Sequence, residues 1–190
     1  MPVALSVAIE RFPIAGAFTI ARGSRTEAVV VVATVTDGTA VGRGECVPYA
    51  RYGETVEGVV AAIEGVAGDL AAPARFDRCR LADLLPAGAA RNALDCALWD
   101  LEAKQTGIPV AIRAGIRDLH PLVTAYTLSL GTPESMAAAA ACAADRPLLK
   151  VKLGGEGDPE RIAAVREAAD RKSTRLNSSH SSVSRMPSSA

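Results

Sequence analysis

Apolar and polar residues alternate along the start of the chain in a pattern that predicts a small antiparallel sheet. Residues 3–12 alternate closely enough for one strand, and residues 18–22 could add a short second run. The segment AVVVVATV at residues 28–35 is rich in β-branched side chains, and Asp37-Gly38 follows it at once, which indicates a hairpin. We therefore expect residues 40–47 to return as a partner strand in a sheet of three strands.

Helical spacing replaces this alternation further along the chain. Apolar residues recur at intervals of three and four, which predicts helices over residues 54–70, 77–85 and 89–104. The last of these has the clearest apolar stripe, and Gly107 and Pro109 end it. A sheet followed by helices predicts an α+β domain, which we assign to residues 1–115.

The pattern changes again after residue 115. Residues 122–130 and 148–153 read as strands, and helices are expected to begin at Thr132 and Asp158, each with a proline at its first position. Strand, helix, strand and helix at this spacing predict the start of a parallel α/β unit over residues 116–169. A complete eight-stranded barrel takes about 250 residues, so we expect only its first part here.

Residues 170–190 differ sharply in composition from the rest. They read DRKSTRLNSSHSSVSRMPSSA and include eight serines. Such a polar segment cannot bury enough surface to fold, so we expect disorder. A natural flexible terminus is one explanation. The alternative that we favour is artefactual, because DRKSTRLNSSH resembles the translation of a sequencing-library adapter joined to a broken reading frame. On that interpretation the chain is an N-terminal fragment, and the native protein continues beyond Ala169.

Charge and composition argue against several classes of function. The 21 basic and 21 acidic residues create no field that would attract nucleic acid. No apolar run approaches the roughly 18 residues of a membrane span, and the N-terminus lacks the features of a secretion signal, so we expect a cytoplasmic protein. The cysteines show no paired spacing and are expected to be free, buried thiols: Cys46, Cys79, Cys96 and Cys142.

The segment LLKVKLGG at residues 148–155 carries the strongest chemical signal. Side chains alternate along a strand, so Lys150 and Lys152 share one face and Val151 lies on the other. In a half-solvated strand the two lysines would simply face water. In a barrel strand they would face the interior at the C-terminal mouth, where such folds keep their chemistry. Neighbouring amines disfavour each other's positive charge, which favours a neutral lysine that can act as a general base.

A glycine pair also has two interpretations. Gly42-x-Gly44, followed by Glu45, could suggest phosphate binding. The segment lacks a third glycine and does not open a helix, so we favour a strand whose backbone packs closely against a neighbour.

Several segments together resemble the enolase superfamily, and in particular its dipeptide epimerase branch, the L-Ala-D/L-Glu epimerases. That family has an α+β capping domain followed by a (β/α)7β barrel. The resemblance therefore implies a capping domain followed by the first βαβα part of a truncated TIM-like barrel. The segments are FTIARGSRTEA (18–28), GRGECVPYARYGET (42–55), LLPAGAARNALDCALWDLEAK (84–104), TAYTLSLGTPESMA (124–137) and LLKVKLG (148–154).

The resemblance implies a reaction and roles for both lysines. Enzymes of this branch remove the proton α to a carboxylate and return it to the opposite face, while Mg²⁺ and fixed cations stabilise the enediolate. Lys152 matches the acid/base lysine of one face. Lys150 matches its neighbour, which would help to hold the carboxylate and favour the neutral form of Lys152. The implied substrate is a small dipeptide, and the full-length parent could form a homo-oligomer.

The family's metal ligands do not precede Ala169. Its three acidic ligands, the opposing lysine and the group that receives the substrate's amino terminus all lie on later strands. Asp145, Glu156 and Asp158 come too early to replace them, and we assign no metal ligand. We expect Mg²⁺ in the full-length parent and no epimerase activity in this chain.

Substrate-binding candidates come from three of the matching segments. An arginine of the first segment, Arg22 in preference to Arg25, could pair with a substrate carboxylate in a two-pronged way, with a solvated loop arginine as the equal alternative. The remaining candidates are Tyr49, Tyr52 and Thr124. Two other functions stay open: a cycloisomerase or o-succinylbenzoate synthase of the same superfamily, and a non-catalytic capping-domain fragment.

Overall fold

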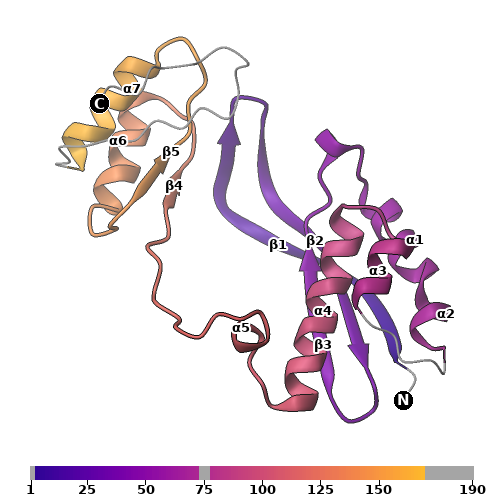
Figure 1. The fold of residues 1–190 in the computed structure, drawn as a ribbon. Helices are drawn as coiled ribbons and strands as arrows, with labels where there is room; N and C mark the ends of the chain where they lie inside the picture. Colours follow the sequence, from indigo (N-terminus) through magenta and orange to yellow (C-terminus); the bar gives the residue numbers. More distant parts are fainter. Residues whose placement is uncertain (1–2, 73–77, 170–190) are drawn as a thin grey trace. The chain divides into compact units, whose positions relative to one another are not determined.

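The computed structural model describes residues 3–72 and 78–169 (Figure 1). The predicted disorder of residues 170–190 lies outside the described residues. Contacts divide the chain into two compact units, one of residues 1–13 with 27–120 and one of residues 14–26 with 121–190. Each unit has its own cluster of buried apolar residues. The domain boundaries at residues 115 and 169 stay a prediction.

The predicted three-stranded sheet is confirmed, with order β1-β2-β3. Strands β2 (Gly23–Thr36) and β3 (Val41–Cys46) pair antiparallel around the expected turn, where the Asp37 carboxylate accepts the backbone N–H of Thr39 at 2.8 Å. Strand β1 (Ala4–Ile20) differs from expectation because it is one continuous strand that includes Pro13. Proline is tolerated there because β1 lies at an edge of the sheet, where an N–H is not needed for pairing.

The helices of the first unit follow the sequence pattern with one break. The helix expected over residues 54–70 divides at Val66 into α1 (Val56–Gly65) and α2 (Ala67–Leu70). Gly65 and Gly68 flank this break, and glycine is a weak helix former. The others are the 3-10 turn η1 (Ala50–Tyr52), α3 (Arg78–Leu84), α4 (Ala89–Thr106) and the unpredicted α5 (Val110–Arg113).

Helix α4 lies along strand β3 (Figure 1) and buries its predicted apolar stripe in the core of the first unit. The two backbones approach closely at the glycine pair. A Cβ atom built on Gly42 would stand 2.1 Å from the carbonyl oxygen of Ala97. The close-packing interpretation of Gly42-x-Gly44 is therefore confirmed, because no larger side chain fits between strand and helix.

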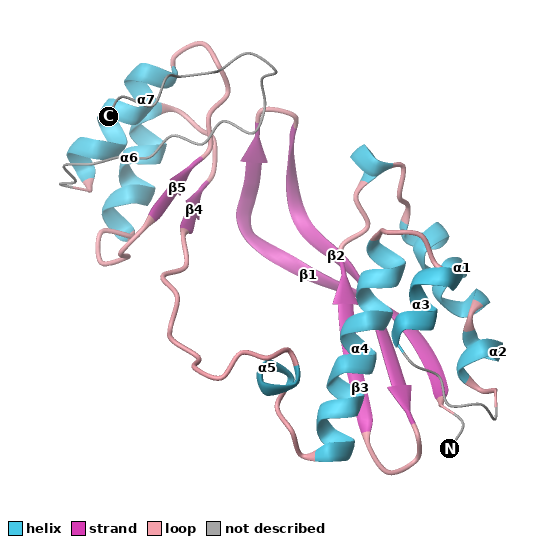
Figure 2. Cartoon of the chain, viewed as in Figure 1, coloured by secondary structure: helices cyan, strands magenta, loops and turns pink. Residues whose placement is uncertain are grey.

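The second unit contains the predicted parallel strand pair. Strand β4 (Tyr126–Leu128) pairs with β5 (Leu149–Val151), and helices α6 (Pro133–Cys142) and α7 (Asp158–Ala168) lie on one side of them (Figure 2). Both strands are shorter than the predicted ranges. The register covers three residues of each strand, from the Tyr126–Leu149 pair to the Leu128–Val151 pair.

Helix starts in the second unit agree in part with the sequence. Thr132 caps α6, with its side chain accepting the Ser135 N–H at 3.3 Å. Helix α7 is capped by Gly157 in a left-handed conformation rather than by Asp158, and Pro159 occupies the second helical position rather than the first. The Asp158 carboxylate instead accepts N–H groups of the preceding turn.

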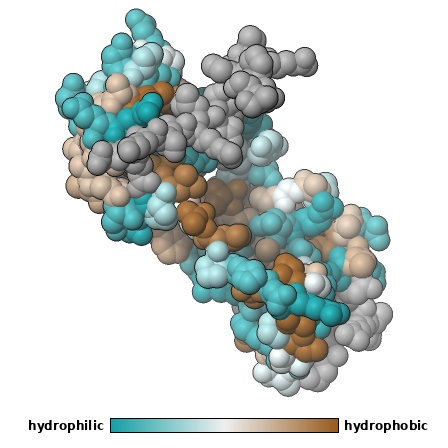
Figure 3. All heavy atoms as spheres, turned by 60° about the vertical axis from the view of Figure 1, so that its left-hand side comes forward, coloured by the Kyte–Doolittle hydropathy of each residue, from teal (hydrophilic) through white to brown (hydrophobic). Residues whose placement is uncertain are grey.

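Surface properties correct one expectation about the cysteines. All four cysteines are free, as predicted, but only Cys46 is buried. No helix among residues 3–72 and 78–169 combines the length and apolar character that crossing a bilayer requires. Apolar side chains do reach the surface, in brown in Figure 3, and Leu122 is 89% exposed, the most among the large apolar residues described in the second unit.

Candidate active site

Lys150 of strand β5 and Lys152, directly after the strand, lie on the face that helices α6 and α7 leave uncovered. Leu149 and Val151 pack against the apolar cluster beneath the helices, so alternation directs Lys150 and Lys152 to the opposite face. Lys150 is exposed, whereas Lys152 is half-buried. The Lys152 backbone N–H donates to the Leu128 carbonyl at 3.1 Å and so extends the ladder beyond the end of β5.

The tip of the β1–β2 hairpin packs against the end of strand β4. The Leu130 N–H donates to the Thr19 carbonyl at 3.0 Å, and the Ser129 hydroxyl donates to the Ala17 carbonyl at 3.3 Å. These bonds hold Phe18 in place, and the Nζ of Lys152 lies over its ring, 5.8 Å from the centroid. An aromatic face at this distance attracts a cation, so the hairpin tip forms one wall beside Lys152.

The structure brings some of the predicted site residues into one unit. Arg22, at the hairpin turn, and Arg25, on strand β2, belong to the same unit as the two lysines and are exposed. Thr124 belongs to that unit as well. It precedes β4, at the opposite end of the strand from the lysine side. The substrate-binding roles of these residues stay predictions.

The tyrosine candidates lie in the first unit. The ring centroids of Tyr49 and Tyr52 are 5.7 Å apart with their planes inclined at 47°. One oxygen of the Glu54 carboxylate accepts the Tyr49 N–H at 2.9 Å, and the other accepts the Ala89 N–H at 2.7 Å. Ala89 is the first residue of helix α4, where a negative charge is favoured by the helix dipole. Glu54 thus fixes the loop that carries both tyrosines.

Sequence reasoning singled out neither Phe18 nor Ser129 as a site residue. Alternation from the Thr127–Lys150 pair places Ser129 on the lysine face, so the strand pattern contained that signal. Phe18 meets Lys152 only through the folding of a distant hairpin, and no local pattern indicates this contact.

No three His, Cys, Asp or Glu side chains in the described ranges are grouped so that they could hold a metal ion. The Asp158 carboxylate is occupied by the N–H groups of Gly154 and Gly155 and by Arg161. The described residues therefore do not supply a magnesium site.

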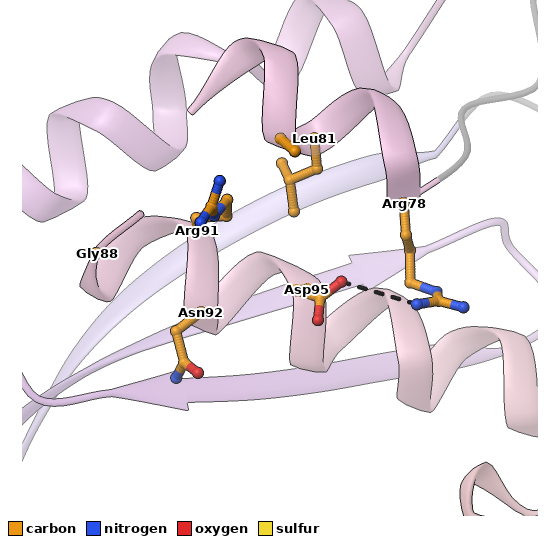
Figure 4. Close-up of a pocket in the computed structure, with 7 residues that line it drawn as sticks. Arg78, Leu81, Gly88, Arg91, Asn92 and Asp95 are labelled. Carbon is orange, nitrogen blue, oxygen red and sulfur yellow. Dashed lines mark ion pairs between the residues drawn. The ribbon is translucent and has the colours of Figure 1, made fainter. Parts of the chain in front are cut away.

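A polar pocket in the first unit is a separate feature. It has a volume of about 450 Å³ and lies between helices α3 and α4 (Figure 4). Its polar side chains make contacts within the unit: Arg78 pairs with Asp95 at 3.9 Å, its guanidinium lies 3.3 Å from the centroid of the Trp99 ring, and Arg91 donates to the Leu85 carbonyl at 3.4 Å. We assign no chemistry to this pocket.

Comparison with known proteins assigns the chain to a protein family. Residues 3–112 match the family described as the mandelate racemase / muconate lactonizing enzyme N-terminal domain. The chain belongs to this family, and its first unit, with the partial barrel that follows, has the fold of the enolase superfamily.

Two similar proteins are described as an epimerase or as a homologue of epimerases. The chain is 45% identical over 161 residues to an L-Ala-D/L-Glu epimerase of Escherichia coli K12, matching 84% of this chain and 50% of that protein. A solved structure from Agrobacterium tumefaciens is also similar. It is an enolase family member with homology to dipeptide epimerases, and it contains sodium and L-Ala-L-Glu. The two chains are 53% identical and superpose with a TM-score of 0.84, and the match covers 89% of this chain and 51% of that one.

A third relative was solved with magnesium. The dipeptide epimerase of Enterococcus faecalis V583, complexed with Mg and L-Leu-L-Tyr, is 28% identical with a TM-score of 0.79, over 88% of this chain and 51% of its own. The chain thus spans about half the length of the relatives that it matches.

Proposed function

We propose that this chain carries one acid/base half of a dipeptide epimerase: the capping domain and the first catalytic lysine. The observation that carries the proposal is the position of Lys152. It is half-buried at the C-terminal end of β5, on the face away from the helices, and its Nζ lies over the Phe18 ring. A lysine at this end of a parallel strand lies where barrel enzymes assemble their reacting groups.

In the proposed reaction Lys152 moves a proton at one face of the substrate's α-carbon. Its neutral amine accepts the proton, and the ammonium that results lies near the Phe18 ring, which stabilises a cation. The Lys150 ammonium, on the same face, would help to hold the substrate carboxylate. Returning the proton to the opposite face needs a second base, which we do not assign to any described residue.

The proposed substrate is a dipeptide with an acidic residue. Arg22 or Arg25 would pair with its side-chain carboxylate, because a guanidinium binds a carboxylate through two parallel hydrogen bonds. Tyr49 and Tyr52 are proposed to contact the substrate from the capping domain, and Thr124 is proposed as a further substrate contact. The reaction would also need a divalent metal, as in the E. faecalis relative. We propose that it takes place in the cytoplasm.

A hybrid protein tests the proposal. Residues 1–169 are joined in frame to the C-terminal half of the A. tumefaciens relative, which is 53% identical to this chain. Incubated with Mg²⁺ and L-Ala-L-Glu in D₂O, the hybrid should exchange the α-proton of the glutamate residue, as seen by loss of its NMR signal. The 190-residue chain alone should show none. A soluble, folded hybrid that exchanges no α-proton would overturn it, and conversion of a cycloisomerase or o-succinylbenzoate synthase substrate by that hybrid would favour the alternative function.

A further inference from the structure

The turns that follow strands β4 and β5 are held together by two residues of helix α7. The Nε of Arg161 donates to the Gly131 carbonyl, after β4, at 2.9 Å. Its NH1 nitrogen donates to the Glu156 carbonyl, after β5, at 2.7 Å, and to the Asp158 carboxylate at 3.0 Å. One guanidinium therefore bridges the ends of two neighbouring parallel strands.

Asp158 completes this bridge on the side of the lysine strand. Its two carboxylate oxygens accept the N–H groups of Gly154, at 3.0 Å, and Gly155, at 2.7 Å. Asp158 and Arg161 are only 16% and 21% exposed, so the ion pair is partly shielded from water. Charge-assisted hydrogen bonds of this kind are stronger than neutral ones.

The hydrogen bonds to Asp158 begin two residues after Lys152, at the Gly154 N–H. Lys152 is tied on one side by its N–H bond to the Leu128 carbonyl, and the next fixed points are the N–H groups of Gly154 and Gly155. A Cβ built on Gly154 would stand 2.8 Å from a Leu130 methyl carbon, so the two turns are already in close contact. Leu130 in turn is bonded to the hairpin tip that carries Phe18.

We infer that Asp158 and Arg161 are positioning residues for Lys152, which hold its amine over the face of the Phe18 ring. The functional meaning of this inference rests on the proposed acid/base role of Lys152. Without the bridge, the segment from Lys152 to Gly155 loses its anchor to the turn after β4. The last ladder bond then frays, and the lysine side chain leaves the aromatic ring.

The full 190-residue chain allows a direct test, because it contains only four lysines and three methionines. The chain is labelled with ¹³C at the lysine ε-carbons and the methionine methyls, and Lys152→Arg assigns the Lys152 signal. Protons above an aromatic face are shielded, so the Lys152 ε-protons should resonate upfield of those of a free lysine. Met136, which is 2% exposed, reports the core of the same unit.

Two variants and a control separate positioning from folding. Arg161→Gln removes the charge, and Arg161→Lys keeps it but offers a single nitrogen that cannot reach both carbonyls. In both, the Lys152 signal should move to the free-lysine position while the Met136 methyl stays at its folded shift. Arg166→Gln, at an exposed arginine of the same helix, should leave both signals unchanged.

Three results would overturn the inference: a Lys152 signal that stays upfield in either Arg161 variant, a Met136 signal that collapses in both Arg161 variants, or a parent chain whose Lys152 already resonates like free lysine. Failure of the proposed function gives a different outcome. In that case Lys152 behaves as expected in the labelled chain, but the hybrid protein exchanges no α-proton.

Discussion

Gly44 of strand β3 lies against Ala93 of helix α4, and a Cβ atom built on the glycine would stand 2.0 Å from the Ala93 carbonyl oxygen. Gly44→Ala should therefore push the helix away from the sheet and destabilise the protein by about 1–3 kcal/mol, the usual cost of overpacking. Urea unfolding of the first unit, followed by circular dichroism, measures the change.

Gly65→Ala is the matched control for that substitution. Gly65 ends helix α1, and a Cβ atom there meets nothing within 4 Å. The change should be neutral or stabilise by up to about 1 kcal/mol, because alanine is the better helix former. Equal destabilisation by both substitutions would contradict close packing at Gly44.

Glu54 is expected to be a structural residue of the second loop. Its carboxylate accepts two backbone N–H groups, one of them at the start of helix α4. Glu54→Ala should lower the free energy of unfolding by about 1.5–3 kcal/mol, the range for hydrogen bonds to a charged group. Glu64→Ala, at an exposed position of α1, should stay within about 0.5 kcal/mol. An unchanged midpoint in Glu54→Ala would show that the loop does not depend on this carboxylate.

Sequence patterns predicted the elements whose signals are local. The Asp37-Gly38 turn and the Thr132 cap were both confirmed, because neighbouring residues alone determine them. The predicted ends of β4 and β5 were wrong because they depend on which residues of the two strands pair, and pairing covers only Tyr126–Leu128 and Leu149–Val151. The break at Val66 was missed because the apolar spacing continues through it.

The candidate site divides in the same way. Alternation along one strand was enough to place Lys150 and Lys152 on a common face, away from the helices. The groups around Lys152 come from elsewhere in the chain. Phe18 comes from the hairpin, and Arg161, which donates to the Gly131 carbonyl in the turn after β4, comes from a later helix. Such contacts follow from tertiary packing, which the spacing of residues within one segment does not contain.

Stability should fall at acidic pH, in part through Asp158. Burial opposes ionisation of this carboxyl, but the N–H groups of Gly154 and Gly155 and the Arg161 charge outweigh it and lower its pKa. A carboxyl whose pKa is lowered by folding stabilises the folded state at pH values above its pKa in the unfolded state, about 3.9 for aspartate. This stabilisation is lost as the pH falls through the lower pKa of the folded state. Asp158→Asn should therefore flatten the decline in Tm below pH 4, and an equally steep decline would contradict the assignment.

The four cysteines should differ in reactivity. Burial and the nearby Glu54 charge raise the pKa of Cys46 to about 11, and its side chain is shielded from solvent. Since the thiolate is the reactive form, Cys46 should be alkylated by iodoacetamide only on unfolding, whereas the exposed Cys79 and Cys142 react in the folded protein. Peptide mass spectrometry identifies the modified residues. Labelling of Cys46 as fast as Cys79 would contradict its burial in the core.

Removing one base of a two-base enzyme should affect one substrate epimer only. In the hybrid protein, Lys152→Ala should slow α-proton exchange of the epimer whose hydrogen faces Lys152 by about 10²–10⁴-fold, the usual contribution of a general base. The other epimer should still lose its proton to the opposing base. Lys104→Ala, which removes an exposed lysine of helix α4, should leave both rates unchanged. If Lys152→Ala slows both epimers equally, or neither, Lys152 is not the base of one face.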